Sequence, residues 1–401
     1  MQPAPKTHLL SIFQIALSGL GILFLLPTAA GLFVLAAASG IAPNIYAQET
    51  LSLVNLAWMA LLTAVLLAPA LVLALLRVFN RPLPSFQHEG KTLSLSLLIA
   101  WPFVLAAGYA LTQNERLAWL LLPPIQLAAV AIPLAWFVLR GRRGLRHLSA
   151  QQNWGTVSFS LVVTPFVTIF AELVVGGILL VGLGVWLMSD PQWMEMFFRA
   201  SQRLANDQID AQLLTRVILP LVMNPQVIVG LLVLTAGIIP LLEEFLKPLA
   251  LWLLAGKRLT PAQGFSGGLV AGAMFGLYES LGLLAASAGG QDWLTLVLGR
   301  TGTGLLHTVT TALVGYGLAC AWQDGRYVRL ALSYFCAALL HGTWNLFGIL
   351  MGLLPVGGLP ELSLTEGAAQ IAPLALAILS VVLMLILLRG SSVLREKKLS
   401  I

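Results

Sequence analysis

Long apolar segments alternate with short polar connections along the whole chain. Each apolar segment is close to or longer than the roughly 20 residues that an α-helix needs to cross a bilayer, so each predicts a membrane span. The expected spans are residues 9–38, 51–78, 93–111, 118–139, 157–187, 225–254, 263–286, 300–322, 329–353 and 371–388. The pattern predicts an all-α fold, a polytopic membrane helix bundle of about ten transmembrane helices.

Basic residues fall on alternate connections between these spans. Connections on the cytoplasmic side of membrane proteins are enriched in Lys and Arg, so both termini are expected to be cytoplasmic. The alternation holds only if residues 225–254 cross the membrane once, and we expect a single span kinked near Gly237 and Pro240. The basic residues on which this orientation depends are Lys6, Arg77, Arg81, Lys91, Arg140, Arg142, Arg143, Arg146, Lys257, Arg258, Arg326, Arg329, Arg389, Arg395, Lys397 and Lys398.

The composition supports a membrane location and excludes other classes. The chain is 58% hydrophobic and 9% charged, with a mean hydropathy of +0.91, which leaves too little polar surface for a soluble domain. The net charge is +6, but no basic stripe with interleaved aromatic residues is present, so no nucleic-acid partner is expected. Cys320 and Cys336 form no metal-spaced motif, and no disulfide partner is expected.

Four parts are expected along the chain. They are an N-terminal bundle of about five spans (1–188), an external amphipathic segment (189–224), a catalytic membrane core (225–355), and the last span with a basic cytoplasmic tail (356–401). In the second part, Asp190-Pro191 is a helix-start signal, and apolar residues recur downstream at helical spacing. We expect a helix lying on the outer membrane surface over residues 189–216, with a solvated linker helix as the alternative.

Four polar clusters interrupt the later apolar segments. Ionisable groups inside a bilayer are costly and usually mark a functional site. Counted from the expected cytoplasmic end of each span, the Glu and His residues lie about 16–24 Å deep, so the shared depth predicts one buried polar pocket. The clusters are Glu243 and Glu244 with Lys247, Phe275 with Glu279, His307 with Thr310 and Thr311, and His341 with Trp344 and Asn345.

The adjacent glutamates of this pocket suit acid–base chemistry. The side chains of Glu243 and Glu244 diverge by about 100° on a helix, so one can face the pocket while a neighbouring helix holds the other. A buried carboxylate near other carboxylates and near Lys247 is under the opposed influences that commonly tune a general base. A salt bridge with Lys247 that only packs helices together is the alternative.

The two histidines can relay a proton, donate to an oxyanion or bind a metal. His341 and Asn345 share a helix face, which suits a pair of donors for a tetrahedral intermediate, with Trp344 as packing or a pocket wall. Alternatively, Glu279, His307 and His341 supply carboxylate and imidazole ligands to a divalent metal such as zinc. No HExxH spacing is present, so the sequence itself requires no cofactor.

The order of these motifs resembles that of a known family. Glu243-Glu244-Phe245-Leu246-Lys247 comes first, followed by Phe275-x-x-x-Glu279, His307 and His341-x-x-Trp344-Asn345. This set resembles the PrsW family of intramembrane proteases over residues 225–347, and it is distantly similar to the CAAX prenyl protease and bacteriocin-immunity superfamily. Where the prenyl-protease pattern has His in a Phe-x-x-x-His motif, this chain has Glu279.

The resemblance implies a peptidase of the prokaryotic plasma membrane that cuts a membrane-anchored protein, such as an anti-sigma factor. It implies that a glutamate of the adjacent pair activates water, that Glu279 and His307 complete the polar centre, and that His341 with Asn345 stabilises the oxyanion. PrsW proteins are usually described as metalloproteases, whereas the prenyl proteases suggest glutamate-activated water without a required metal. We expect the metal-free chemistry.

Two other functions are open at this point. A proton- or ion-coupled transporter also carries Glu and His near the membrane midplane, and a noncatalytic membrane scaffold could retain the motif set. Glu172, an acid of the fifth span, is expected to make a packing hydrogen bond, to line a substrate entrance or to pair with Arg300. Asp292 and Arg300 are expected to mark the external end of their connection.

Overall fold

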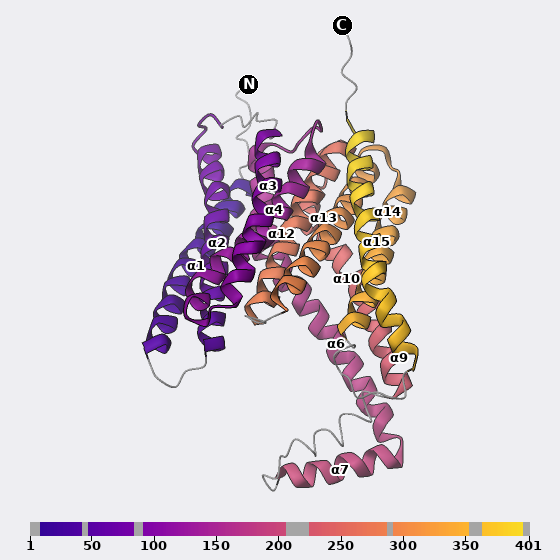
Figure 1. The fold of residues 1–401 in the computed structure, drawn as a ribbon. Coiled ribbons are helices and arrows are strands. Elements are labelled where there is room, and N and C mark those ends of the chain that lie inside the picture. The colour runs from indigo at the N-terminus through magenta and orange to yellow at the C-terminus, as the bar shows by residue number, and fades with distance from the viewer. Residues whose placement is uncertain are drawn as a thin grey trace.

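The computed structural model describes residues 9–41, 47–83, 91–205, 224–286, 292–352 and 363–395. Within these ranges all regular structure is helical, and ten segments are long and apolar enough to cross a membrane. Figure 1 shows most of the helices gathered in one bundle, with α6 leading away from it to α7. The predicted all-α bundle of about ten spans is confirmed.

The helices of the N-terminal half are α1 (Leu9–Ile41), α2 (Ala47–Val78), α3 (Lys91–Thr112), α4 (Glu115–Arg142), α5 (Ala150–Val162), α6 (Thr164–Met188) and α7 (Pro191–Ala205). Those of the C-terminal half are α9 (Pro225–Val233), the π-helix η1 (Leu234–Ile238), α10 (Ile239–Leu246), α11 (Leu249–Trp252), α12 (Pro261–Ala286), α13 (Trp293–Asp324), α14 (Tyr327–Gly352) and α15 (Ser363–Val393). Side chains from α2, α4, α5, α12, α13, α14 and α15 share one hydrophobic cluster.

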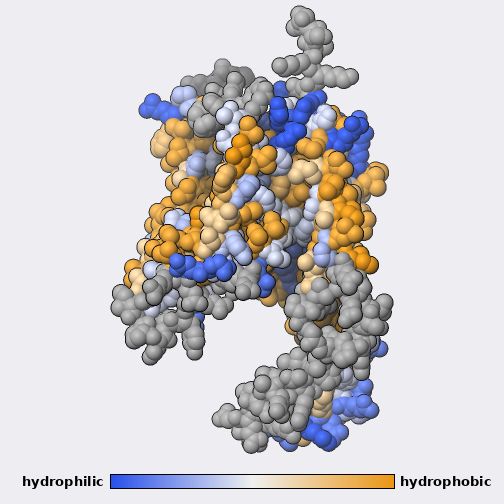
Figure 2. Space-filling view, in the orientation of Figure 1, coloured by the Kyte–Doolittle hydropathy of each residue, from blue (hydrophilic) through white to orange (hydrophobic). Residues whose placement is uncertain are grey.

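Apolar side chains cover the outside of the bundle. Phe103, Phe170, Leu332 and Leu374 are all more than half exposed. Figure 2 shows apolar residues along the sides of the bundle, with hydrophilic residues gathered mainly at its upper end and on α7. This distribution is that of a protein whose sides contact lipid, because a soluble protein rarely exposes so large an apolar surface.

The fifth expected span is two helices. Residues 157–187 were expected to form one helix, but α5 and α6 meet at Val163, and Pro165 stands in the first turn of α6. Proline has no N–H to continue the hydrogen-bond ladder of α5, so the helix ends and a new one begins. Together the two helices span 39 residues, about twice the length that crosses a bilayer.

The span that carries the adjacent glutamates is interrupted, as predicted, at Pro240. Residues Pro225–Trp252 form one candidate span, divided into α9, η1, α10 and α11. Pro240 cannot donate a hydrogen bond to the preceding turn, and that turn is the π-helix η1. The carbonyl oxygen of Thr235 in this turn accepts a hydrogen bond from Asn345 Nδ2 at 3.0 Å, so α14 docks on the interruption.

Glycines bring α12 and α13 into backbone contact. A Cβ atom on Gly268 would lie 2.4 Å from the Thr311 carbonyl oxygen, and one on Gly272 would lie 2.1 Å from the His307 carbonyl oxygen. Gly342 of α14 approaches η1 in the same way, since its Cβ would lie 2.1 Å from the Ala236 carbonyl oxygen. These contacts hold His307 and His341 at fixed distances from their neighbouring helices.

We expect Gly272→Ala to lower the free energy of unfolding by about 1–3 kcal/mol, because the added methyl group must separate α12 from the backbone of α13. Gly282→Ala on the same helix is the matched control, since its Cβ would meet nothing within 4 Å. Thermal unfolding of both variants in one detergent measures the difference. Equal melting temperatures for the two variants would contradict the backbone contact described here.

The amphipathic segment contains the predicted helix. The helix α7 covers Pro191–Ala205, and Asp190 Oδ1 accepts a hydrogen bond from the backbone N–H of Gln192 at its start. Residues 206–216 of the predicted segment lie outside the described residues. Figure 1 shows α7 apart from the bundle at the end of α6. Its place on the outer membrane surface stays a prediction.

Candidate active site

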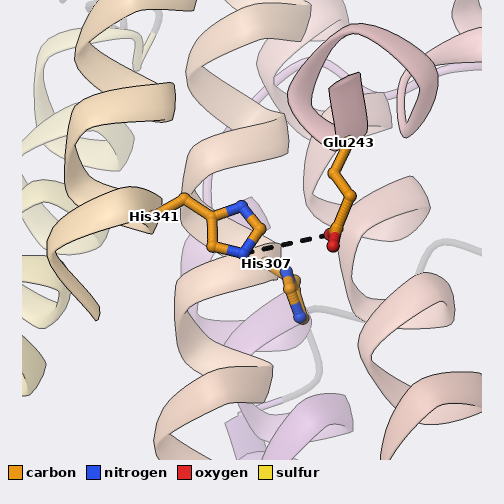
Figure 3. Close-up of side chains that lie close together, drawn as sticks. All are labelled: Glu243, His307 and His341. Atoms are coloured by element: carbon orange, nitrogen blue, oxygen red, sulfur yellow. Dashed lines mark ion pairs between the residues drawn. The ribbon is translucent and has the colours of Figure 1, made fainter. Parts of the chain in front are cut away.

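Polar side chains from α10, α12, α13 and α14 meet inside the bundle. Figure 3 shows Glu243, His307 and His341 pointing toward one another from three different helices. Glu243, His307 and His341 are 9%, 1% and 2% exposed, so the meeting point is buried. The shared depth of the four polar clusters predicted such a pocket, and the structure brings a member of each cluster into it or against it.

Lys247 stands at the centre of this group. Its fully buried Nζ lies 2.7 Å from Glu244 Oε1, 2.9 Å from Glu243 Oε2 and 2.8 Å from His307 Nδ1. His341 Nδ1 is also near, at 3.3 Å. Since an ammonium group only donates, the Nδ1 atom of His307 is the accepting nitrogen of its ring. Lys247 is therefore the cation that holds the acids and imidazoles together.

The adjacent glutamates have different environments. Glu244 is fully buried, and its Oε1 accepts hydrogen bonds from Lys247, from Thr310 Oγ1 at 3.0 Å and from His341 Nδ1 at 2.9 Å. The Glu243 side chain is 12% exposed, and its Oε2 lies at an ion-pair distance from Lys247 without the geometry of a hydrogen bond. Oε2 of each glutamate has no hydrogen-bond partner, so the two residues differ in the three donors on Glu244 Oε1 and in the partial exposure of Glu243.

The shorter contact of each imidazole indicates which nitrogen carries the proton. His341 Nδ1 is nearer to Glu244 Oε1, at 2.9 Å, than to Lys247 Nζ, at 3.3 Å, and donation to this carboxylate leaves the lone pair of a neutral His341 on Nε2, which lies 3.9 Å from Glu243 Oε2. His307 has the opposite arrangement, because its Nε2 donates to Glu279 Oε2 at 2.6 Å. Each ring therefore offers one nitrogen toward the centre and uses the other for a carboxylate.

Glu279 connects His307 to a second buried cation. Arg300 Nη2 lies 2.8 Å from Glu279 Oε2, and Arg300 Nε donates to Ser280 Oγ at 3.1 Å. Arg300 was expected at the external end of its span, and this was wrong, because α13 begins earlier, at Trp293, and Arg300 is 9% exposed. Its position two helical turns before His307, on the same helix face, was the signal that could have found it.

We expect Arg300→Met to lower activity by about 10–100-fold, because Glu279 then loses the cation that holds it against His307. Arg326→Met is the matched control, since Arg326 is exposed and pairs only locally with Asp324. Initial rates of both variants, compared at equal protein and lipid, measure the effect. Unchanged activity of Arg300→Met would show that Glu279 needs no counterion to position His307.

Four other predicted residues support this group. Asn345 Nδ2 donates one hydrogen bond to the Thr235 carbonyl oxygen, and Trp344 Nε1 donates to Thr303 Oγ1 at 3.1 Å. The Phe275 ring lies edge-on to His307 at 5.3 Å between centroids and under Lys247 Nζ at 5.0 Å. Thr311 is buried one helical turn after His307. Phe275 thus packs against the group, Trp344 joins α14 to α13 one turn before His307, and the Asn345 amide is turned toward η1.

Glu172 of α6 also reaches this region. Its carboxyl group interacts with those of Glu243 and Glu279, so the acid approaches the centre from the N-terminal half of the chain. The side chain of Glu279 is 42% exposed, in contrast to the closed environment of Glu244. Glu279 is therefore the acid of this group with the most exposed side chain, and α6 is the helix of the N-terminal half that approaches it.

One group of residues in the described part of the chain could hold a metal ion. Ligand atoms of Glu243, His307 and His341 all lie within 4.8 Å of one another. A carboxylate with two imidazoles is a common donor set for zinc, and Glu279 on the outer nitrogen of His307 is a typical second partner for a metal-bound histidine. The donors therefore fit a divalent metal, with Glu243 in the place that the sequence prediction had assigned to Glu279.

The charges of the group also leave room for a cation. Three carboxylates face two permanent cations, Lys247 and Arg300, and Glu172 adds a fourth acid nearby. An uncompensated negative charge in a buried site attracts a proton or a metal ion. Lys247 competes for such an ion, because its Nζ already contacts Glu243 and His307.

The fold and the centre together define a polytopic membrane protein with ionisable groups buried between its spans. Residues 208–387 match the model of a family described as PrsW family intramembrane metalloprotease. This match confirms the resemblance drawn from the four motifs. The matched part contains α10, α12, α13 and α14, whereas Glu172 lies outside it. No curated protein and no solved structure matches the chain.

Proposed function

We propose that this protein hydrolyses a peptide bond of a membrane-anchored protein in the plasma membrane of a prokaryote, with Glu243 as the base that activates water. The observation that supports the assignment is the position of Glu243, whose partly exposed side chain places Oε2 beside the buried Lys247 and 3.9 Å from His341 Nε2. The match to the family model supports proteolysis as the class of reaction. An anti-sigma factor is the kind of substrate that the family resemblance suggests.

In the proposed reaction, a water molecule binds to Glu243 Oε2 and loses a proton to it as the water oxygen attacks the peptide carbonyl carbon. Lys247 is the nearest permanent positive charge to the developing oxyanion and stabilises it. Glu243 then returns the proton to the peptide nitrogen as the C–N bond breaks, which yields a carboxylic acid and an amine, and the acid then loses its proton to water. His341 Nε2, 3.9 Å from Glu243 Oε2, can hold the proton between these steps.

Other residues of the centre keep this geometry. Glu244 fixes Lys247 and His341, and Glu279 fixes His307. Asn345 has a second amide N–H after its bond to Thr235, so it remains a second candidate donor to the oxyanion. The interrupted backbone at η1 suits peptide chemistry in a membrane, because irregular backbone at membrane depth is found where it lines a cavity or is buried in protein.

A divalent metal such as zinc, if bound, would be held by Glu243, His307 and His341 and would polarise a water molecule or the peptide carbonyl. In that state Lys247 would have to withdraw from His307 Nδ1, since both compete for its lone pair. Glu244 would still orient His341 and Glu279 would still orient His307. The metal ligands and the groups of the metal-free reaction are thus the same buried residues.

We expect the metal content of the purified protein to distinguish the metal-bound form of the site from the metal-free form. If a metal is held as described, about one ion per chain is lost in His341→Gln, whereas Glu279→Gln weakens binding by about 10–100-fold. Metal analysis of the wild type and the two variants, followed by titration with zinc, measures this. Stoichiometric metal that survives His341→Gln would contradict the proposed ligands.

Cleavage of a single-pass membrane protein by the purified protein tests the proposed function. The account expects two fragments whose formation depends on Glu243. The transporter alternative expects an intact substrate together with ion flux that depends on the same glutamate. A noncatalytic scaffold would bind the substrate and do neither, so the three functions have separate outcomes.

A further inference from the structure

A pocket of about 460 Å³ lies outside the candidate active site, where the first turns of α1 and α5 meet the end of α2 and α11. Its volume is within the range of about 300–1,000 Å³ that is typical of small-molecule sites. It lies almost entirely in the N-terminal half of the chain, which the family model does not match. Only residues 250–257 of its lining belong to the matched part.

Among the described residues, the lining of this pocket carries positive charge and no acid. Arg77 and Lys257 are its charged residues in this part of the chain, and no described Asp or Glu lines it. Both side chains are exposed, and neither forms an ion pair with the described residues. Exposed cations near the end of a membrane span can attract an anionic ligand.

Hydrogen bonds hold the walls of the pocket together. Gln151 Nε2 of α5 donates to Ser11 Oγ of α1 at 2.7 Å, and Gln14 Nε2 of α1 donates to the Ala70 carbonyl of α2 at 2.9 Å. The buried side chains of Phe159 and Leu254 add an apolar surface. The pocket is therefore a built concavity with a polar and an apolar side.

The surroundings favour a ligand with apolar tails. Leu9, Phe13 and Leu253 line the pocket and are 75%, 44% and 42% exposed. These side chains stand at or next to the ends of candidate membrane spans, a position at which apolar side chains face the acyl chains of one leaflet. A soluble anion would leave this apolar surface uncovered, whereas the acyl chains of a lipid would cover it.

We propose that this pocket binds one anionic phospholipid, with the phosphate at Arg77 and Lys257 and an acyl chain along Phe13 and Leu253. The bound lipid would join the residues that follow α11 to the N-terminal helices α1 and α2, because these contacts come from all three. The helix α11 follows Lys247 and Pro248 directly. Through this lipid, the N-terminal helices would therefore help to hold the span that carries Lys247 in position. This inference does not depend on the proposed proteolysis.

Binding of phosphatidylglycerol and phosphatidylcholine to the purified full-length protein, counted by native mass spectrometry, tests the proposal. We expect one phosphatidylglycerol per chain to bind on the order of 10-fold more tightly than phosphatidylcholine, and the double variant Arg77→Gln/Lys257→Gln to lose this preference. The matched control is Arg81→Gln/Arg258→Gln, which removes the same charge from neighbouring exposed residues outside the pocket. The control should keep the preference.

Three results would overturn the proposal. An equal loss in the control pair would mean that diffuse surface charge, not the pocket, attracts the lipid. Full displacement of phosphatidylglycerol by inorganic phosphate would identify a soluble anion as the occupant. Equal binding of the two lipids by the wild type would remove the charge recognition. An unchanged melting temperature of Arg77→Gln/Lys257→Gln in phosphatidylcholine verifies that the variant is folded.

Discussion

Glu243→Gln is expected to lower the rate of substrate cleavage by a factor of at least about 100, because a base that takes the proton from water contributes about 10²–10⁴-fold. The amide has nearly the shape of the carboxyl group, so the side chain still fits. Lys247 keeps its hydrogen bond to Glu244, and the fold should therefore survive. Initial rates and melting temperatures of the purified variant measure the two effects.

Glu244→Gln is the matched comparison, because the two residues are adjacent but only Glu244 is committed to three donors. Its replacement should lower both activity and stability, since three buried partners lose the charge that they bind. Both variants should therefore be slow, but only Glu244→Gln should have a clearly lower melting temperature. If Glu243→Gln were fully active and a folded Glu244→Gln were inactive, Glu244 would be the base and our assignment of Glu243 would be wrong.

Lys247→Met should cost on the order of 3–5 kcal/mol of stability, the largest loss expected from a single substitution in this chain. Removing one partner of a buried ion pair leaves the other uncompensated, and here the ammonium serves two carboxylates. The variant is also expected to be inactive. Its free energy of unfolding can be measured by denaturant titration in mixed micelles, with Arg258→Met as the exposed control.

The double variant Glu244→Gln/Lys247→Met tests the reason for that loss. If the cost comes from an unpaired buried charge, neutralising Glu244 should restore much of the stability without restoring activity. An additive loss in the double variant would show that Lys247 stabilises the bundle by packing and not by its charge. Recovery of stability while the protein remains inactive supports the role of Lys247 at the oxyanion.

The sequence predicted the membership of the candidate site better than its contacts. Helical rise along four spans was enough to place Glu243, Glu279, His307 and His341 at one depth, because the depth of a residue in a regular helix follows from its number alone. The number of spans was predictable for the same reason, since length and hydropathy are local properties. Side-chain contacts between helices depend on rotation and packing, which local patterns do not contain.

Three features show where that limit lies. Lys247 was expected as a partner of Glu243 one turn away, but its long side chain reaches two further helices. Arg300 was misplaced because α13 begins at Trp293, before the apolar stretch from which its span was predicted. The Asn345 amide meets the Thr235 carbonyl because Pro240 interrupts the ladder, and a kink prediction does not say which carbonyl becomes free.

The choice between metal-free and metal-dependent chemistry is also set by three-dimensional contacts. The sequence has no zinc-binding spacing, yet α10, α13 and α14 bring Glu243, His307 and His341 together. Ligands from three helices leave no short motif, because their spacing in sequence depends on the connections between the helices. The family description as a metalloprotease agrees with the presence of such a group.

Mass spectrometry of a cleavage reaction in water enriched in oxygen-18 tests the central claim most directly. The purified protein and a single-pass substrate would be reconstituted in the same vesicles, with Glu243→Gln in parallel. The account predicts two fragments, one heavy oxygen in the new carboxyl group, a cut within or next to the substrate's membrane span, and no product from Glu243→Gln. An intact substrate, or fragments of equal yield from Glu243→Gln, would contradict it.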